Sequence, residues 1–150
     1  MFIRNSSWKY PGWCGQVYDE SHYVTRGKFS EARFERECLA EYAEIFPTVS
    51  VDAGYYKFPS PQYLEGLCKQ VPDSFRFGFK VTDTITIKNY TNLPRFGVLA
   101  GKPNEHFLDA DLFKKAFLSS FDRVQDNIGV FIFEFSHFYP KDFTHGRDFV

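Results

Sequence analysis

Residues 75–81 read FRFGFKV, in which a phenylalanine or valine alternates with arginine, glycine and lysine. Because successive side chains of a strand point to opposite faces, this alternation predicts a strand with one apolar face. A helix is predicted on each side of it. Before it, Ser60-Pro61 supplies an N-cap residue and a proline at the first helical position. After it, residues 109–126 carry their apolar side chains on one helical stripe.

The same two periods continue along the chain and alternate strictly. The predicted order is strand (2–7), helix (34–46), strand (48–53), helix (61–70), strand (75–81), helix (109–126) and strand (129–135). A long segment with little periodicity, residues 83–106, separates the last helix from the strand before it. Strict alternation of strands and helices builds a parallel sheet covered by helices, with right-handed crossovers.

A barrel is the arrangement we expect from this order. A glycine-rich Gly-x-Gly-x-x-Gly or Walker loop after the first strand would indicate a nucleotide-binding doubly wound sheet, and the sequence has neither. We therefore predict an α/β fold of the parallel (β/α) barrel, or TIM, type. Such barrels typically have eight strands in about 250 residues. We thus expect residues 1–150 to form one domain that holds about the first half of a barrel and is truncated at its C-terminus.

Composition and charge narrow the possible partners. With 43% hydrophobic and 20% aromatic residues the chain can bury one core. Lys+Arg (18) and Asp+Glu (19) nearly balance without long runs of one sign, so we expect neither nucleic acid nor a membrane as partner. The three cysteines and four histidines lack metal-ligand spacing, so we predict no metal and no other cofactor. Without an apolar leader or spanning segment, a cytoplasmic location is expected.

A set of short motifs gives the chain a family resemblance. In order and spacing they resemble the YecE-like family, also called domain of unknown function seventy-two; they are WKYPGW (8–13), YAEIFPTV (42–49), YYKFPSP (55–61), PDSFRFGFK (72–80) and IT (85–86). The resemblance covers roughly residues 2–140. It implies a TIM-barrel fold, members longer than this chain, and no established biochemical activity.

The chain also departs from the pattern of the family it resembles. Residues 4–7 read RNSS where the family usually carries Gly-Thr-Ser-Gly, and residues 49–52 read VSVD in place of Val-Glu-Ile-Asn. Ile87 replaces a usual histidine, and residues 134–136 read EFS in place of Gln-Leu-Pro. We therefore expect a divergent or partial member whose ligand differs from that of its relatives.

Charged residues near the predicted strand ends are the candidate catalytic groups. Inward-pointing residues at the carboxyl ends of barrel strands line the active site. This places Lys80, Asp52 and Glu134 in one mixed-charge cluster, which Arg4 joins from the first strand. The lysine could act as a base or hold a phosphate or carboxylate, and the carboxylates could transfer protons. The alternative is that these charges only neutralise one another inside the fold.

Aromatic residues in a turn-rich loop are the candidate ligand contacts. Residues 6–18 read SSWKYPGWCGQVY, with large rings beside a Pro-Gly turn. We predict that rings of this loop and of the loop after residues 48–53 roof the charged cluster and stack on a flat ligand; they are Trp8, Tyr10, Trp13, Tyr55 and Tyr56. The alternative is that Trp8 and Trp13 merely plug the end of the barrel.

Two functions follow from these residues and both stay open. The first is a small-molecule enzyme or binder for an anionic ligand, phosphorylated or carbohydrate-like, held by Lys80, Arg4 and the aromatic loop. The second is a non-catalytic, incomplete barrel that associates with another protein chain, as a homo-oligomer through the exposed edge of strand 129–135. The sequence does not decide whether the chain is an enzyme.

Overall fold

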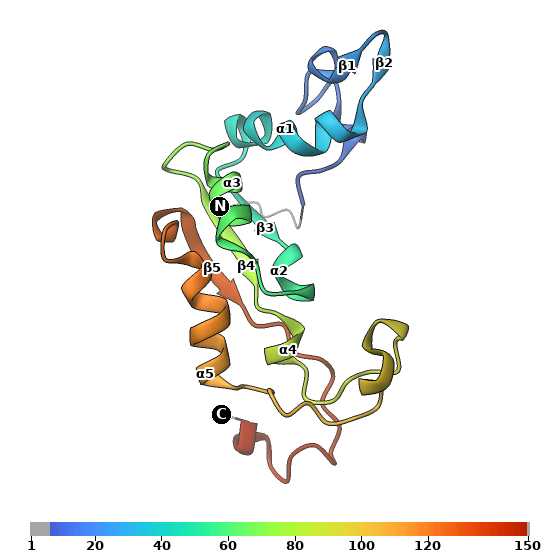
Figure 1. Cartoon of the computed structure of the whole chain (residues 1–150), viewed down its shortest axis with the longest axis vertical. Coiled ribbons are helices and arrows are strands. Elements are labelled where there is room, and N and C mark those ends of the chain that lie inside the picture. Colours follow the sequence, from blue (N-terminus) through green and yellow to red (C-terminus); the bar gives the residue numbers. More distant parts are fainter. Residues whose placement is uncertain (1–6, 150) are drawn as a thin grey trace.

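The computed structural model describes residues 7–149 and shows an α/β fold (Figure 1). The helices and strands, in groups, are α1 (Glu31–Ile45), α2 (Ala53–Tyr56), α3 (Pro61–Cys68), α4 (Asp83–Thr86), α5 (Ala110–Leu112), β1 (Val24–Thr25), β2 (Lys28–Phe29), β3 (Thr48–Val51), β4 (Arg76–Lys80) and β5 (Ile128–Ile132). Further 3-10 turns lie along the chain, at Pro11–Trp13, Glu20–Tyr23, Pro94–Leu99, Leu118–Phe121, Gln125–Asn127 and Gly146–Phe149.

A parallel sheet of three strands forms the centre of the fold, in the order β3-β4-β5. Val49 is paired with Phe77 and Phe79 with Phe131, and the register shifts between Phe77 and Gly78. A separate antiparallel hairpin, β1-β2, lies at the N-terminal end of α1 (Figure 1). Its turn contains Arg26 and Gly27, both with positive φ, as a tight two-residue hairpin requires.

The predicted barrel is wrong. Closing a barrel requires the first and last strands of the sheet to pair, and within residues 7–149 the parallel sheet has three strands and stays open at β3 and β5. The predicted strand 2–7 falls on residues outside those described, except for Ser7, which is not in a strand. Between Ser7 and α1 the chain forms 3-10 turns and the hairpin, so the described residues do not make a four-stranded half barrel either.

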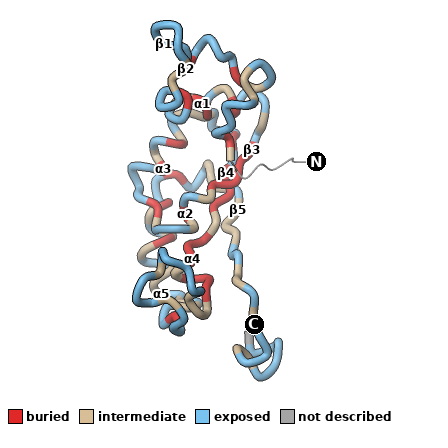
Figure 2. The backbone as a smooth tube through the Cα atoms, turned by 90° about the vertical axis from the view of Figure 1, so that its right-hand side faces the viewer, coloured by how far each residue is buried: buried red, intermediate tan, exposed pale blue. Residues whose placement is uncertain are grey.

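Aromatic packing between β4 and the helices builds the core, and Figure 2 shows the helices on one side of the sheet. Phe77 lies between Phe75 and Phe79, with ring centroids 4.9 and 5.9 Å apart. Farther along, Phe121 meets Phe79 and Phe131 edge to face, each at 4.9 Å. Edge-to-face pairs are the favoured geometry of aromatic rings, so the alternating phenylalanines of residues 75–81 fix how the sheet and helices pack.

The helices follow local signals in the sequence. α1 begins at Glu31, somewhat before the predicted residue 34, because the Ser30 side chain accepts a hydrogen bond from the Arg33 backbone N–H. α3 begins at Pro61 after the Ser60 cap, as predicted. The predicted helix 109–126 is interrupted: α5 continues into a π-helical turn, Phe113–Phe117, and then a 3-10 turn. Within this π-helical turn the Phe113 and Phe117 rings stack at 5.4 Å.

Candidate functional site

Three charged side chains meet at the carboxyl edge of the sheet. Lys80 ends β4, Asp52 follows β3, and Glu134 follows β5 by two residues. The Lys80 ammonium lies 3.3 Å from the Asp52 carboxylate and 2.7 Å from that of Glu134. Parallel strands end on the same edge, so residues far apart in the sequence converge there. We call these three residues the Lys80 cluster; they are the predicted catalytic residues, and the structure brings them together.

The charge state of the Lys80 cluster is set by its ion pairs. The hydrogen bond to Glu134 raises the pKa of Lys80, burial opposes that rise, and the Asp52 carboxylate adds to it. Lys80 therefore stays protonated at neutral pH. Asp52 is less well satisfied than Glu134. Its buried Oδ1 atom has the Lys80 ammonium, 3.3 Å away, as its one polar partner among the described residues, and that contact is poorly aligned for a hydrogen bond. A buried carboxylate oxygen with a poorly aligned donor gains from a better one.

A second ion pair lies beside the Lys80 cluster. Asp83, at the start of α4, is 2.7 Å from Arg95 in the turn Pro94–Leu99. The Asp83 side chain is only 8% exposed, and burial raises its pKa although the Arg95 guanidinium opposes that shift. Neither residue was predicted from the sequence. The available signal was the position of Asp83, two residues after the end of the predicted strand 75–81.

Two tyrosines of α2 lie beside the ion pairs, and Tyr55 lies near both. The Tyr55 ring centroid is 5.9 Å from the Lys80 ammonium and 5.8 Å from the Arg95 guanidinium. Tyr56 is 66% exposed, and its ring lies 5.2 Å from the same guanidinium. Burial raises the pKa of Tyr55, and the nearby negative charges of Asp83 and Glu134 add to the rise. Tyr55 is thus a neutral hydroxyl group at neutral pH.

Gly54 explains why α2 can lie so close to the sheet. A Cβ atom at this position would stand 3.0 Å from the Lys80 carbonyl oxygen, closer than a Cβ normally approaches backbone. Without a side chain, the first turn after β3 packs directly on the end of β4. This contact positions the Tyr55 ring over the ion pairs.

The described part of the aromatic loop, residues 7–18, does not roof the Lys80 cluster. Trp8 is buried in the core, where its carbonyl oxygen accepts a hydrogen bond from the Tyr18 hydroxyl. Trp13 packs between Tyr10 and Phe46, with centroids 4.9 and 6.4 Å away. Phe46 precedes β3, so these rings contact the amino end of the sheet. Of the predicted ligand contacts only Tyr55 and Tyr56 lie near the charges, and Arg4 falls outside the described residues.

The thiols and the possible metal ligands of the described residues were compared with what reactive cysteines and metal sites require. Burial raises the pKa of the Cys14 thiol, and it raises that of Cys38 to about 12, so neither is a ready thiolate. Within residues 7–149 no group of three or more His, Cys, Asp or Glu side chains is arranged to hold a metal ion. Every described helix is also too short or too polar to cross a bilayer.

The family follows from the whole chain rather than from the site alone. Residues 2–148 match the sequence model of a family described as "Protein of unknown function DUF72". The chain belongs to the DUF72 family. No curated protein and no solved structure gives a significant match. Because the family description assigns no activity, the chemistry of this DUF72 chain has to be argued from its own side chains.

Proposed function

We propose that the chain binds a small carbohydrate-like ligand with an anionic group at the Lys80 cluster. The observation that carries the proposal is the convergence of Asp52, Lys80 and Glu134. In it the buried Asp52 Oδ1 atom has only the Lys80 ammonium, 3.3 Å away and poorly aligned, as a polar partner among the described residues. In open α/β sheets, ligands bind outside the carboxyl ends of the strands, which is where this atom lies. A ligand hydroxyl would give this oxygen a second, better-aligned donor.

The other members of the cluster complement such a ligand. Lys80 has three N–H donors, and Glu134, which accepts from it, is 52% exposed and able to swing into solvent. An anionic group of the ligand would then replace the Glu134 carboxylate at the ammonium. The Tyr55 and Tyr56 rings offer an apolar face to the sugar ring, and the Arg95 guanidinium lies beside them.

The proposal extends to proton transfer. Asp52 keeps its place beside the ammonium when the anionic group of the ligand displaces Glu134, so its carboxylate can take a proton from the ligand as a general base. Lys80 would hold the anionic group and stabilise negative charge that develops on the ligand. Hydrolysis or isomerisation of a phosphorylated sugar would use these roles.

Titration of the full chain with ribose 5-phosphate, followed by amide NMR, tests this site. We expect saturable shifts at residues 52–56, 80–83 and 133–135. Lys80→Ala and Asp52→Asn should each weaken binding at least about tenfold, equivalent to ~1.4 kcal/mol. Lys69→Ala is the control, because Lys69 is an exposed lysine at the end of α3 without a described ion pair. Unchanged binding by a folded Lys80→Ala variant, or shifts confined elsewhere, would refute the proposal.

A free edge of the sheet favours a second candidate function, association with another copy of the chain. Within the described residues β5 pairs with β4 alone, so its outer backbone groups lack strand partners. A second copy could pair there. Light scattering over a range of concentrations tests this candidate. A dimer mass supports it, and a monomer at every concentration rejects it.

A further inference from the structure

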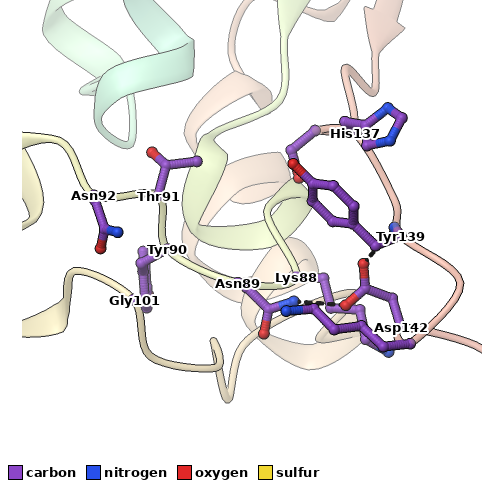
Figure 3. A pocket seen from close by; sticks show the side chains of 11 residues that line it. Lys88, Asn89, Tyr90, Thr91, Asn92, Gly101, His137, Tyr139 and Asp142 are labelled. Atoms are coloured by element: carbon purple, nitrogen blue, oxygen red, sulfur yellow. Dashed lines mark hydrogen bonds between the residues drawn. The ribbon is translucent and has the colours of Figure 1, made fainter.

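A polar cavity of about 500 Å³ lies apart from the Lys80 cluster, between the loop after α4 and the C-terminal arm (Figure 3). We call it the loop–arm cavity. Residues 88–92 and Gly101 form one wall, and residues 136–142 supply the other. Its volume is that of ordinary small-molecule sites. The proposed function makes no use of it.

Asp142 holds the two walls together. One of its carboxylate oxygens accepts a hydrogen bond from the Asn89 side chain at 2.9 Å, and the other accepts from the Tyr139 backbone N–H at 2.7 Å. Figure 3 shows both bonds at the base of the cavity. The carboxylate is therefore occupied by the protein itself. It braces the arm against the loop.

Asn104 fixes the loop wall from behind. This buried side chain donates to the carbonyl oxygens of Thr84 and Ile87, at 2.8 and 2.7 Å. It also accepts from the Tyr90 hydroxyl and the His106 backbone N–H, at 2.9 and 3.0 Å. All of these bonds are internal to the protein, so the wall is ordered before any ligand arrives. Preformed walls reduce the entropy lost on binding.

The cations of the loop–arm cavity differ from Lys80 and Arg95 in having no carboxylate partner. Neither Lys88 nor Lys141 forms an ion pair with any described residue, although both line the cavity. The Lys88 ammonium lies 3.8 Å from the centre of the Phe143 ring and 5.6 Å from that of Phe107. Ring faces attract a cation but take none of its hydrogen bonds. Its N–H donors remain for an anion.

Aromatic side chains line the same space. Tyr139 and His137 lie edge to face at 4.7 Å on the arm, and the Lys141 ammonium is 5.8 Å from the Tyr139 ring. Tyr90 stands on the opposite wall (Figure 3). Unpaired lysines next to exposed rings match a ligand that combines a negative group with a flat ring.

We propose that the loop–arm cavity is a second binding site, specific for a small aromatic anion. Lys88 and Lys141 hold its phosphate or carboxylate, and the Tyr139 ring packs against its flat ring. Asp142 is a positioning residue that keeps the two lysines on facing walls. The site is independent of the Lys80 cluster and shares no residue with it.

Calorimetric titration of the full chain with adenosine 5′-monophosphate tests this second site, with adenosine and inorganic phosphate as comparisons. We expect the nucleotide to bind at least about tenfold more tightly than either part, because the site engages both ring and anion. Phosphate binding as tightly as the nucleotide would overturn the proposal, since the ring would contribute nothing. Adenosine alone binding equally well would also overturn it.

Variants separate this site from the Lys80 cluster. Lys88→Ala and Lys141→Ala should each weaken nucleotide binding about tenfold or more, and Tyr139→Leu should weaken it while leaving phosphate binding unchanged. Lys115→Ala, at an exposed lysine outside the cavity, is the control. Lys80→Ala should retain full nucleotide binding. If folded Lys88→Ala and Lys141→Ala variants bind as the wild type does, or if Lys80→Ala abolishes binding, the loop–arm cavity is not the site.

Discussion

The Lys80 ammonium lies 2.7 Å from the Glu134 carboxylate, so an ion pair joins the end of β4 to the chain that leaves β5. Both side chains are partly exposed, and solvent screens the attraction between them. The pair therefore orders the carboxyl edge of the sheet without holding the fold together. This combination suits a group that has to give way to a ligand.

A double-mutant cycle measures the strength of this pair. We expect Lys80→Ala and Glu134→Ala to show a coupling free energy of about 0.2–1 kcal/mol in urea unfolding. Arg33 and Glu37 of α1, 2.8 Å apart and also partly exposed, provide the control cycle, with about 0.3–0.5 kcal/mol expected. A coupling above ~2 kcal/mol would mean that Glu134 is too firmly held to be displaced.

A second prediction concerns the close approach of α2 to β4. Gly54→Ala places a Cβ atom 3.0 Å from a backbone oxygen, so the two elements must separate. We expect a loss of about 1–3 kcal/mol in the free energy of unfolding. Gly66→Ala is the matched control, because nothing lies within 4 Å of its Cβ in the middle of α3. There alanine should stabilise the helix by about 0.5–1 kcal/mol. Thermal unfolding followed by circular dichroism reports both, and equal effects would contradict this account.

The Asp83–Arg95 pair predicts a pH dependence of stability. Burial raises the pKa of Asp83 in the folded state above its unfolded value of 3.8. The folded state therefore binds a proton at Asp83 more tightly than the unfolded state does. Asp83 contributes least to the free energy of unfolding when the pH is above its pKa in the folded state. As the pH falls through that pKa, the wild type should gain stability relative to Asp83→Asn. Urea unfolding of both proteins from neutral pH to pH ~4 measures the difference. A difference that moves the other way would show that the arginine outweighs burial.

Replacing Arg95 should change the free energy of unfolding at neutral pH by more than the fall in pH does. Arg95→Met leaves the Asp83 carboxylate buried without its cation. Because the guanidinium is itself about a third exposed, we expect a cost of about 1–3 kcal/mol rather than the full cost of breaking a buried pair. The double variant with Asp83→Asn should recover most of that loss. No recovery would show that Arg95 acts through its packing on Phe96 instead.

A further prediction concerns the turn Glu20–Tyr23 that leads into the hairpin, which Glu41 of α1 holds. Its carboxylate accepts hydrogen bonds from the Tyr23 hydroxyl at 2.7 Å and the Asp19 backbone N–H at 2.7 Å, and it lies 2.8 Å from His22 Nδ1. The bond to Glu41 raises the pKa of His22 above 6.5. The stability that the protonated His22 ring contributes is thus present below pH 6.5, and it is lost as the pH rises through the pKa of His22 in the folded state.

An NMR titration of the His22 ring checks this effect. We expect Glu41→Gln to lower the pKa of His22 towards 6.5 and to remove the extra stability at acidic pH. Glu44→Gln, an exposed position on the same helix, is the control and should leave the His22 pKa in place. If both variants lower it equally, the general negative charge of α1 is responsible.

Local patterns in the sequence predicted the strands of the parallel sheet, helices α1 and α3, and part of the site. They missed the hairpin β1-β2 and the interruption of the predicted helix 109–126. The FRFGFKV alternation and the Ser60-Pro61 start gave β4 and α3, because period and capping depend on neighbouring residues only. Asp52, Lys80 and Glu134 could be placed together because all three stand at the carboxyl ends of successive parallel strands. Their catalytic roles stay predictions.

Contacts between distant segments decided the rest. Whether strands close into a barrel depends on pairing between the first and last of them, which no local period records, and here the sheet stays open. The Trp13 ring packs on Phe46 rather than over Lys80. Apolar attraction is non-directional, so the sequence does not record which apolar surface a ring will cover. The Asp83–Arg95 pair and the loop–arm cavity likewise join residues from separate loops. The sequence alone determined the elements with a strong local period and the convergence of their charged ends. Tertiary structure determined which surfaces those ends face, because side-chain packing is chosen in three dimensions.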